Sequence, residues 1–133
     1  MDAEVKKTAL RMIPYGLYIM TAKGKDGGVA AATVNWVTQT AFAPPIVAVG
    51  VKVGSGTYAV AKEAGAFALN MLGKGQQGPA FDFFKPAQVE GDKISGQPFR
   101  NGSTGAPRLT ALPSAFECTL LEIVERGDHH IFV

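Results

Sequence analysis

The sequence is poor in several features on which common classes of protein depend. It has one cysteine, Cys118, so no disulfide can form within the chain, and this usage suits a reducing compartment. It has no apolar run of membrane-spanning length, and the first residues, MDAEVKKTALRMI, lack the uninterrupted apolar core of a signal peptide. Together these absences predict a soluble, cytoplasmic protein.

Motifs for several kinds of catalysis and binding are also missing. Despite 16 glycines there is no GxGxxG or Walker pattern, and no serine lies in a nucleophile elbow. His129 and His130 are adjacent, so on a strand they point to opposite faces and cannot simply share one metal ion. Net charge is +2, and the longest basic cluster, Lys6–Lys7, is too small for a nucleic-acid surface. Neither a metal site nor a nucleic-acid or membrane partner is predicted.

What the chain does have is enough apolar sequence for one domain. Its 133 residues are 47% hydrophobic and 18% charged, which excludes disorder and allows a real core. The last predicted strand stops at Val133 without a turn or polar tail. We therefore expect a single domain over residues 1–133 that is truncated at its C-terminus.

Local patterns predict a series of strands with a few short helices. Helices are expected at 2–13, with Asp2 as cap and Pro14 as stop, at 57–63, with Gly65 as stop, and at 75–84. Strands are expected at 16–23, 29–39, 46–52 (buried on both faces), 66–72, 114–126 and 129–133. Residues 85–112 show no period and are expected to be a long functional or mobile loop. This order predicts a barrel or a compact sandwich.

The stretch TVNWVTQTAFAPP, residues 33–45, gathers polar side chains around the only tryptophan. These are Thr33, Asn35, Thr38, Gln39 and Thr40, beside Trp36, and Pro44–Pro45 then forms a corner. The simplest explanation is that they face solvent, since threonine favours strands, while Trp36 packs in the core. The alternative is that they face a flat ligand with hydrogen-bonding edges.

The stretch VKVGSGTYAV, residues 51–60, favours the ligand hypothesis. Lys52, Ser55 and Thr57 lie in a glycine-containing loop that leads into a helix, where backbone N–H groups, hydroxyls and an ammonium could hold a phosphate. A capped helix with a surface lysine would explain the same residues. Taken together, the two stretches suit flavin mononucleotide (FMN), which has a flat heteroaromatic head and a phosphate tail.

Four segments in this order resemble the flavin reductase-like family, the FMN-binding split barrels that include flavoredoxins and NAD(P)H:flavin oxidoreductases. They are IPYGLYIMTA (13–22), ATVNWVTQTAFAPPIVAVGV (32–51), GTYAVAKEAGAFALNML (56–72) and FECTLLEIVERGDHHIFV (116–133). The resemblance implies a mainly β fold with short helices, an antiparallel split β-barrel. It further implies a homodimer with FMN, or alternatively FAD, near the subunit interface.

The resemblance also implies roles for individual residues. Thr33, Asn35, Trp36, Val37 and Thr38 match the segment that lines the flavin, Thr40 starts the turn after it, and Lys52, Ser55 and Thr57 match the phosphate-contacting stretch. His129 matches a histidine beside the flavin, where nicotinamide would dock; a strand residue bonded to a backbone carbonyl is the alternative. Its role would be electrostatic or positional, because hydride transfer needs alignment more than a base. Ala41 departs from the serine that the family often has.

Two functions are compatible with such a site. The first is a flavin reductase that transfers hydride from NAD(P)H to FMN and passes electrons on to an acceptor, which could be a redox partner protein. The second is a non-catalytic FMN-binding protein for electron relay or flavin storage. Cys118 is expected to be an inert thiol buried in a strand, with a redox role as the alternative.

Overall fold

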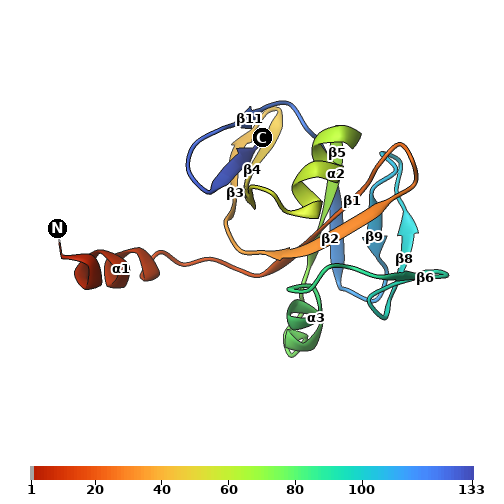
Figure 1. Ribbon diagram of the computed structural model, residues 1–133, viewed down its shortest axis with the longest axis horizontal. Helices are drawn as coiled ribbons and strands as arrows, with labels where there is room; N and C mark the ends of the chain where they lie inside the picture. The colour runs from red at the N-terminus through yellow and green to blue at the C-terminus, as the bar shows by residue number, and fades with distance from the viewer. Residues whose placement is uncertain (1) are drawn as a thin grey trace.

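The strands in the computed structural model, which describes residues 2–133, form three four-stranded antiparallel sheets (Figure 1). The first has the order β10 (Ser114–Thr119), β5 (Ala66–Met71), β1 (Tyr18–Lys23) and β2 (Val29–Val34). The second has the order β11 (Ile123–Val124), β12 (His129–Phe132), β4 (Pro45–Lys52) and β3 (Val37–Phe42). The third is a meander of β6 (Val89–Glu90), β7 (Lys93–Ile94), β8 (Gln97–Asn101) and β9 (Pro107–Leu109).

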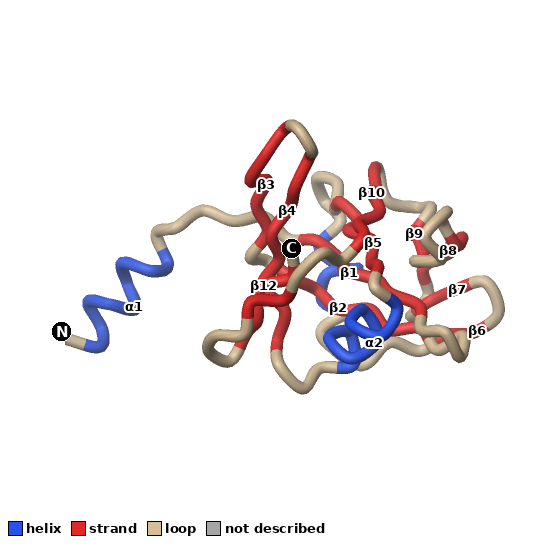
Figure 2. The backbone as a smooth tube through the Cα atoms, turned by 90° about the horizontal axis from the view of Figure 1, so that it is seen from above, coloured by secondary structure: helices blue, strands red, loops and turns tan. Residues whose placement is uncertain are grey.

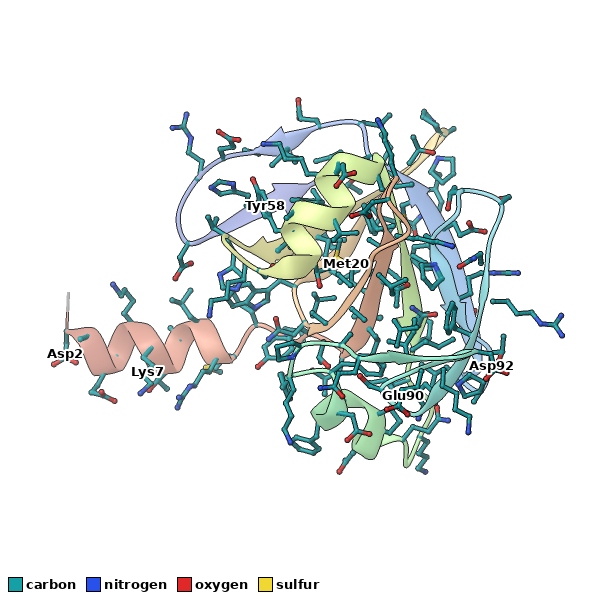
Figure 3. All side chains as sticks on the ribbon, turned by 45° about the vertical axis from the view of Figure 1, so that its right-hand side comes forward. Asp2, Lys7, Met20, Tyr58, Glu90 and Asp92 are labelled. Carbon is teal, nitrogen blue, oxygen red and sulfur yellow. The ribbon has the colours of Figure 1, made fainter. Side chains whose placement is uncertain are left out.

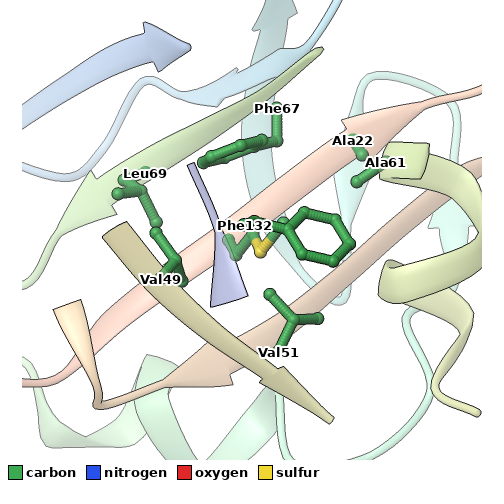
Figure 4. Close-up of a cluster of buried hydrophobic side chains, with 8 residues drawn as sticks. Ala22, Val49, Val51, Ala61, Phe67, Leu69 and Phe132 are labelled. Atoms are coloured by element: carbon green, nitrogen blue, oxygen red, sulfur yellow. The ribbon is translucent and has the colours of Figure 1, made fainter. Parts of the chain in front are cut away.

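The main core lies between the first two sheets and one helix. It consists of Met20 and Ala22 on β1, Val49 and Val51 on β4, Phe67 and Leu69 on β5, Phe132 on β12 and Ala61 (Figure 4). On each of β1, β4 and β5 the two core residues are two positions apart, as expected for side chains on one face of a strand. Figure 3 shows Met20 inside the body, whereas Asp2 and Lys7 lie on a helix that stands clear of it. Two sheets closing around one core are consistent with the predicted split barrel.

The helix α2 (Gly56–Ala64) covers the main core and begins and ends where the sequence predicts. Ser55 is its N-cap, because the Ser55 hydroxyl accepts a hydrogen bond from the backbone N–H of Tyr58 at 3.1 Å. Gly65 ends the helix with φ of 69°, a left-handed conformation that glycine adopts without steric cost. A third helix, α3 (Gln77–Asp82), lies within the predicted range of 75–84.

The first helix, α1 (Ala3–Arg11), projects from the body and buries none of its residues (Figure 2). Asp2 caps it as predicted, since the Asp2 carboxylate accepts hydrogen bonds from the N–H groups of Glu4 and Val5. Within residues 2–133, none of the helices has both the length and the apolar character needed to cross a lipid bilayer.

The prediction of a mainly β fold with antiparallel strands and short helices is confirmed, but four local predictions are wrong. Residues 29–39 form two strands that belong to different sheets, with the break at Asn35 and Trp36. Residues 114–126 are likewise divided between β10 and β11. Strand β4 is only partly buried, because one of its faces lies toward the exposed Trp36. Residues 85–112 contain the four strands of the third sheet, which are too short, at two to five residues, to show a period.

Candidate functional site

A cavity of about 590 Å³ runs along β2, between the loop that joins β4 to α2 on one side and the segment after α3 on the other. Ala30 and Ala32 on β2 pair with Ala22 and Met20 of the main core, so their methyl groups lie on the side of the sheet that faces α2. Small side chains at these positions leave room between β2 and the start of α2. The predicted residues Thr33, Asn35, Lys52, Ser55, Thr57 and His129 all line this cavity.

One end of the cavity is suited to an anion. The backbone N–H groups of Gly56 and Thr57 belong to the first turn of α2, where a helix has no carbonyl of its own to receive them. Lys52 ends the neighbouring strand and is exposed, so its charge lies beside this turn without being buried. The positive end of a helix next to an ammonium group is a common arrangement for binding phosphate.

Ser55 has a structural role in this loop. Its hydroxyl donates to the carbonyl oxygen of Lys52 at 2.8 Å and accepts from the N–H of Tyr58 at 3.1 Å. The capped-helix explanation is thus correct for Ser55, and the capping bond fixes how the first turn of α2 faces the cavity. The pairing of β4 with β12 places His129 directly opposite Lys52, on the same side of the sheet.

A second cavity, of about 620 Å³, lies on the other side of His129. Its walls come from the chain before β1, the start of β3, the middle of β4 and the loop before β12, and include Tyr15, Trp36, Val37, Thr38 and Arg126. Trp36, Val37 and Thr38, which were predicted to line the flavin with Thr33 and Asn35, thus line this second cavity and not the first. His129 lines both cavities.

Trp36 is held against the backbone of β4. Its carbonyl oxygen accepts a hydrogen bond from the N–H of Gly50 at 2.8 Å, and a side chain at position 50 would lie 3.3 Å from the indole. A glycine at position 50 therefore lets the indole lie flat on the strand. The indole is half exposed and meets the ring of His129 edge-on, with 4.8 Å between the ring centroids.

The two histidines lie on opposite faces of β12, as predicted. The Nδ1 atom of His129 is 3.0 Å from the Asp128 carboxylate, and this hydrogen bond lowers the pKa of Asp128. A proton on Nδ1 leaves Nε2 of a neutral imidazole as an acceptor. On the other face, Nδ1 of His130 lies 2.7 Å from the Tyr58 hydroxyl, which is a structural contact between β12 and α2. The partner of His129 is therefore a carboxylate. The alternative prediction, that His129 is a strand residue bonded to a backbone carbonyl, does not describe this contact.

Three of the predicted threonines, Thr33, Thr38 and Thr40, have their hydroxyls engaged within the protein, and that of Thr38 donates to the carbonyl oxygen of Gln39 at 3.2 Å. Thr33 donates to the carbonyl oxygen of Ala80, and its N–H donates to that of Phe83 at 3.2 Å. These bonds attach α3 and its following residues to the free edge of β2. Thr40 lines neither cavity, and its hydroxyl lies 3.4 Å from the carbonyl oxygen of Ile46 across the β3–β4 hairpin. Thr40 therefore lies at the bulge of β3, where no turn begins, and its contact with flavin stays a prediction.

One wall of the first cavity was not predicted from the sequence. The wall is the segment 83–87, which follows α3 and runs beside β2. Phe83 is buried there and anchors the segment in a second core cluster, while Phe84 and Lys85 are exposed. The sequence FDFFKP does carry a signal, since paired aromatics next to a lysine are unusual on a surface loop.

The first cavity fits a flavin phosphate and its attached ring in chemistry and in size. Its volume lies within the range of about 300–1,000 Å³ that is typical of small-molecule sites. Free helix N–H groups and Lys52 supply donors, His129 lies next to Lys52, and Asn35 after the end of β2 supplies further hydrogen-bonding groups. Among residues 2–133, the side chains form no cluster of three or more potential metal ligands.

Comparison with known proteins gives a family and a set of relatives. The family model described as "Flavin reductase like domain" matches residues 10–133. A protein of Rhizobium meliloti named "Probable flavin reductase" is 28% identical over 99% of this chain and 42% of its own length. The "Flavin reductase" of Pseudomonas putida is 29% identical over 99% of this chain and 76% of its own length. The chain thus spans between two fifths and three quarters of these relatives.

A solved structure gives the same result for the fold. The styrene monooxygenase flavin reductase from Pseudomonas putida S12 is 26% identical, and superposes with a TM-score of 0.79 over 95% of this chain and 80% of that chain.

Proposed function

Because this chain belongs to the flavin reductase-like domain family, we propose that it is an NAD(P)H:flavin oxidoreductase whose flavin is FMN or FAD. The observation that carries the proposal is the position of His129 between two adjacent cavities. One cavity has an anion-binding end and the other is largely apolar, as expected for a phosphorylated flavin beside a nicotinamide ring. A protein that only stores flavin has no need of the second cavity.

In this proposal the residues of the chain bind and align the two substrates. Lys52 and the first turn of α2 hold the flavin phosphate, and β2 with Asn35 lies along the ribityl chain and ring edge. Trp36 and His129 form the boundary at which the two rings meet, and the Asp128 carboxylate fixes the orientation of the imidazole. A bound flavin supplies a ring nitrogen that accepts hydride from reduced nicotinamide. Alignment of this kind accounts for catalysis without a side-chain base.

We also propose that the protein works as a homodimer, because α1 leaves apolar surface without a partner in one chain. Val5 and Leu10 on α1 and its C-cap residue Met12 are 58–78% exposed. A nine-residue helix without tertiary contacts is only marginally stable in water. A second copy that covers the apolar residues of α1 would stabilise this helix. Sedimentation of the wild type and of a Val5→Glu/Met12→Glu variant tests this, since the variant is expected to be monomeric.

The reduced flavin would serve an acceptor protein. The related structure is the flavin reductase of a styrene monooxygenase, and this supports a partner monooxygenase for the present chain as well. The unpaired thiol Cys118 suits a reducing cytoplasm, where such a two-protein system would operate.

Anaerobic reduction of flavin tests the proposed function. NADH or NADPH is added to the protein with FMN and, separately, with FAD, and the visible absorbance of the flavin is followed against a sample without protein. Loss of the absorbance that depends on the protein is the expected result. Binding of flavin without reduction by either nucleotide would instead support electron relay or storage. A protein that binds neither flavin would overturn the proposal.

A further inference from the structure

Phe84 and Lys85 form a feature of the first cavity that a mononucleotide leaves without a role. Both line the cavity from the wall at the edge of β2, opposite the wall that contains Lys52 and the start of α2. The cavity therefore has a cation on each of two opposing walls. FMN has one phosphate, and the first turn of α2 with Lys52 is sufficient to hold it.

The Phe84 ring is presented to solvent by a well-anchored backbone. Its neighbour Phe83 is 1% exposed, donates its N–H to the carbonyl oxygen of Pro79 at 3.3 Å, and accepts from the N–H of Thr33 at 3.2 Å. Phe84 itself is 64% exposed, and Pro86 restricts the backbone just after it. An exposed aromatic ring on a fixed backbone, at the wall of a cavity, offers a flat surface on which a ligand ring can stack.

A neighbouring ring supports this orientation. Phe81, at 66% exposure, lies 5.9 Å from Phe84 between ring centroids, with the two planes tilted by 55°. Phe81 does not line the cavity, whereas Phe84 does. Contact with Phe81 thus limits the motion of the Phe84 ring on one side and leaves the cavity side open.

We infer that Phe84 and Lys85 form a subsite for the adenosine-monophosphate half of a dinucleotide, with the purine stacked on Phe84 and the added phosphate beside Lys85. This inference rests on the proposed function, because it takes the flavin phosphate to lie at the start of α2. Purine rings stack well on an exposed aromatic side chain, and the ammonium matches the charge of a diphosphate. FAD and NAD(P)H both contain this half.

Binding measurements with Phe84→Ala test the inference, and Phe81→Ala is the matched control because it removes a similarly exposed ring outside the cavity. Titrations compare FMN with FAD on the free protein, and reduced nicotinamide mononucleotide with NADH on the FMN-loaded protein. Phe84→Ala is expected to weaken one dinucleotide by about five- to a hundredfold, as for the loss of one stacked base, and to change the mononucleotides less than about twofold. Lys85→Gln is expected to weaken the same dinucleotide and to reduce the dependence of its binding on salt.

The results distinguish FAD from NADH as the occupant of the subsite, and both from the absence of such a subsite. A selective loss of FAD assigns the subsite to the flavin dinucleotide, and a selective loss of NADH assigns it to the nicotinamide dinucleotide. Equal effects of Phe84→Ala on mononucleotides and dinucleotides, or equal effects of both phenylalanine variants, would overturn the inference while leaving the proposed function intact. A wild-type protein that binds no flavin of either kind would instead refute the proposed function.

Discussion

The ring of His129 stands edge-on to the indole of Trp36, with 4.8 Å between centroids and 69° between planes. Because His129 lines both cavities, this contact marks the place where a flavin and a nicotinamide would meet. Trp36 is the only tryptophan, so its fluorescence reports on both ligands.

Replacing His129 by alanine should affect turnover more than flavin binding. We expect the rate of NAD(P)H oxidation to fall roughly ten- to a hundredfold, as for a lost positioning contact, with flavin affinity changed less than about twofold. Stopped-flow reduction and a Trp36 fluorescence titration measure the two quantities. His130→Phe is the control, because His130 contacts Tyr58 on the other face and should leave the rate unchanged. Rates in the His129→Ala protein equal to those of the wild type would give this histidine a structural role only.

Replacing Lys52 by alanine should weaken the binding of phosphorylated flavin. The expected loss is about 1–3 kcal/mol, as for a hydrogen bond to a charged group, and it should shrink at high salt. Riboflavin, which has no phosphate, should bind both proteins equally. Lys62→Ala serves as the control, since Lys62 lies in the last turn of the same helix. An equal loss for riboflavin and FMN would contradict a phosphate site beside Lys52.

Asn70 holds two sheets together from the interior and should be important for stability. It is fully buried, donates to the carbonyl oxygen of Ile19 at 2.8 Å, and accepts from the N–H of Leu109 at 2.8 Å. Asn70→Ala leaves these groups buried and unpaired, so the free energy of unfolding should fall by about 2–4 kcal/mol. Urea denaturation measures this, with the exposed Asn101→Ala as control, expected to change stability by less than about 0.5 kcal/mol.

Glu117 should contribute stability that depends on pH. Its carboxylate accepts hydrogen bonds from the hydroxyl and N–H of Thr104, which lower its pKa below the ordinary value of 4.5. A lowered pKa means that the stabilisation is present above pH 4.5 and is lost as the pH falls through the folded-state pKa. Glu117→Gln should therefore lower both the free energy of unfolding and the melting temperature at neutral pH. The loss in free energy should be less than about 1 kcal/mol, because solvent screens the charge at this site. The difference from the wild type should vanish in acid, and a constant difference would argue against this linkage.

Cys118 should be slow to react with thiol reagents in the folded protein. It is half buried on β10, and burial raises the pKa of its thiol to about 11. At pH 8 roughly one molecule in a thousand would carry the reactive thiolate. Alkylation by iodoacetamide should accelerate strongly in denaturant. Fast alkylation of the native protein would revive the redox role for this residue.

Local signals in the sequence predicted those parts of the fold that depend on neighbouring residues. Asp2, Ser55 and Gly65 occupy the cap positions expected of them, because a cap is decided within a few residues. The lysine and the helix start on the anion-binding side of the cavity are brought together by the same short loop. This is why the residues of that loop could be predicted to lie together.

Features that depend on distant segments could not be predicted. After the break at Asn35 and Trp36 the chain pairs with β4, and the N–H of Gly50 on that strand donates to the carbonyl oxygen of Trp36. No glycine or proline marks this break in the sequence, so β2 and β3 looked like one strand. The hydroxyl of Thr33 likewise has a partner, Ala80, that lies 47 residues away. A polar side chain in a strand does not reveal whether it faces a ligand or the protein.

The passage of the chain from one sheet to another at Asn35 and Trp36 has a consequence for stability. The two sides of the first cavity belong to different sheets, β2 to one and β4 with β12 to the other. A molecule bound there would contact both sheets and so link the two halves of the barrel. Binding therefore raises the free energy of unfolding. The increase grows with the logarithm of the ratio of ligand concentration to dissociation constant. Amide hydrogen exchange should then be slower with ligand than without it in both sheets, including at residues far from the ligand.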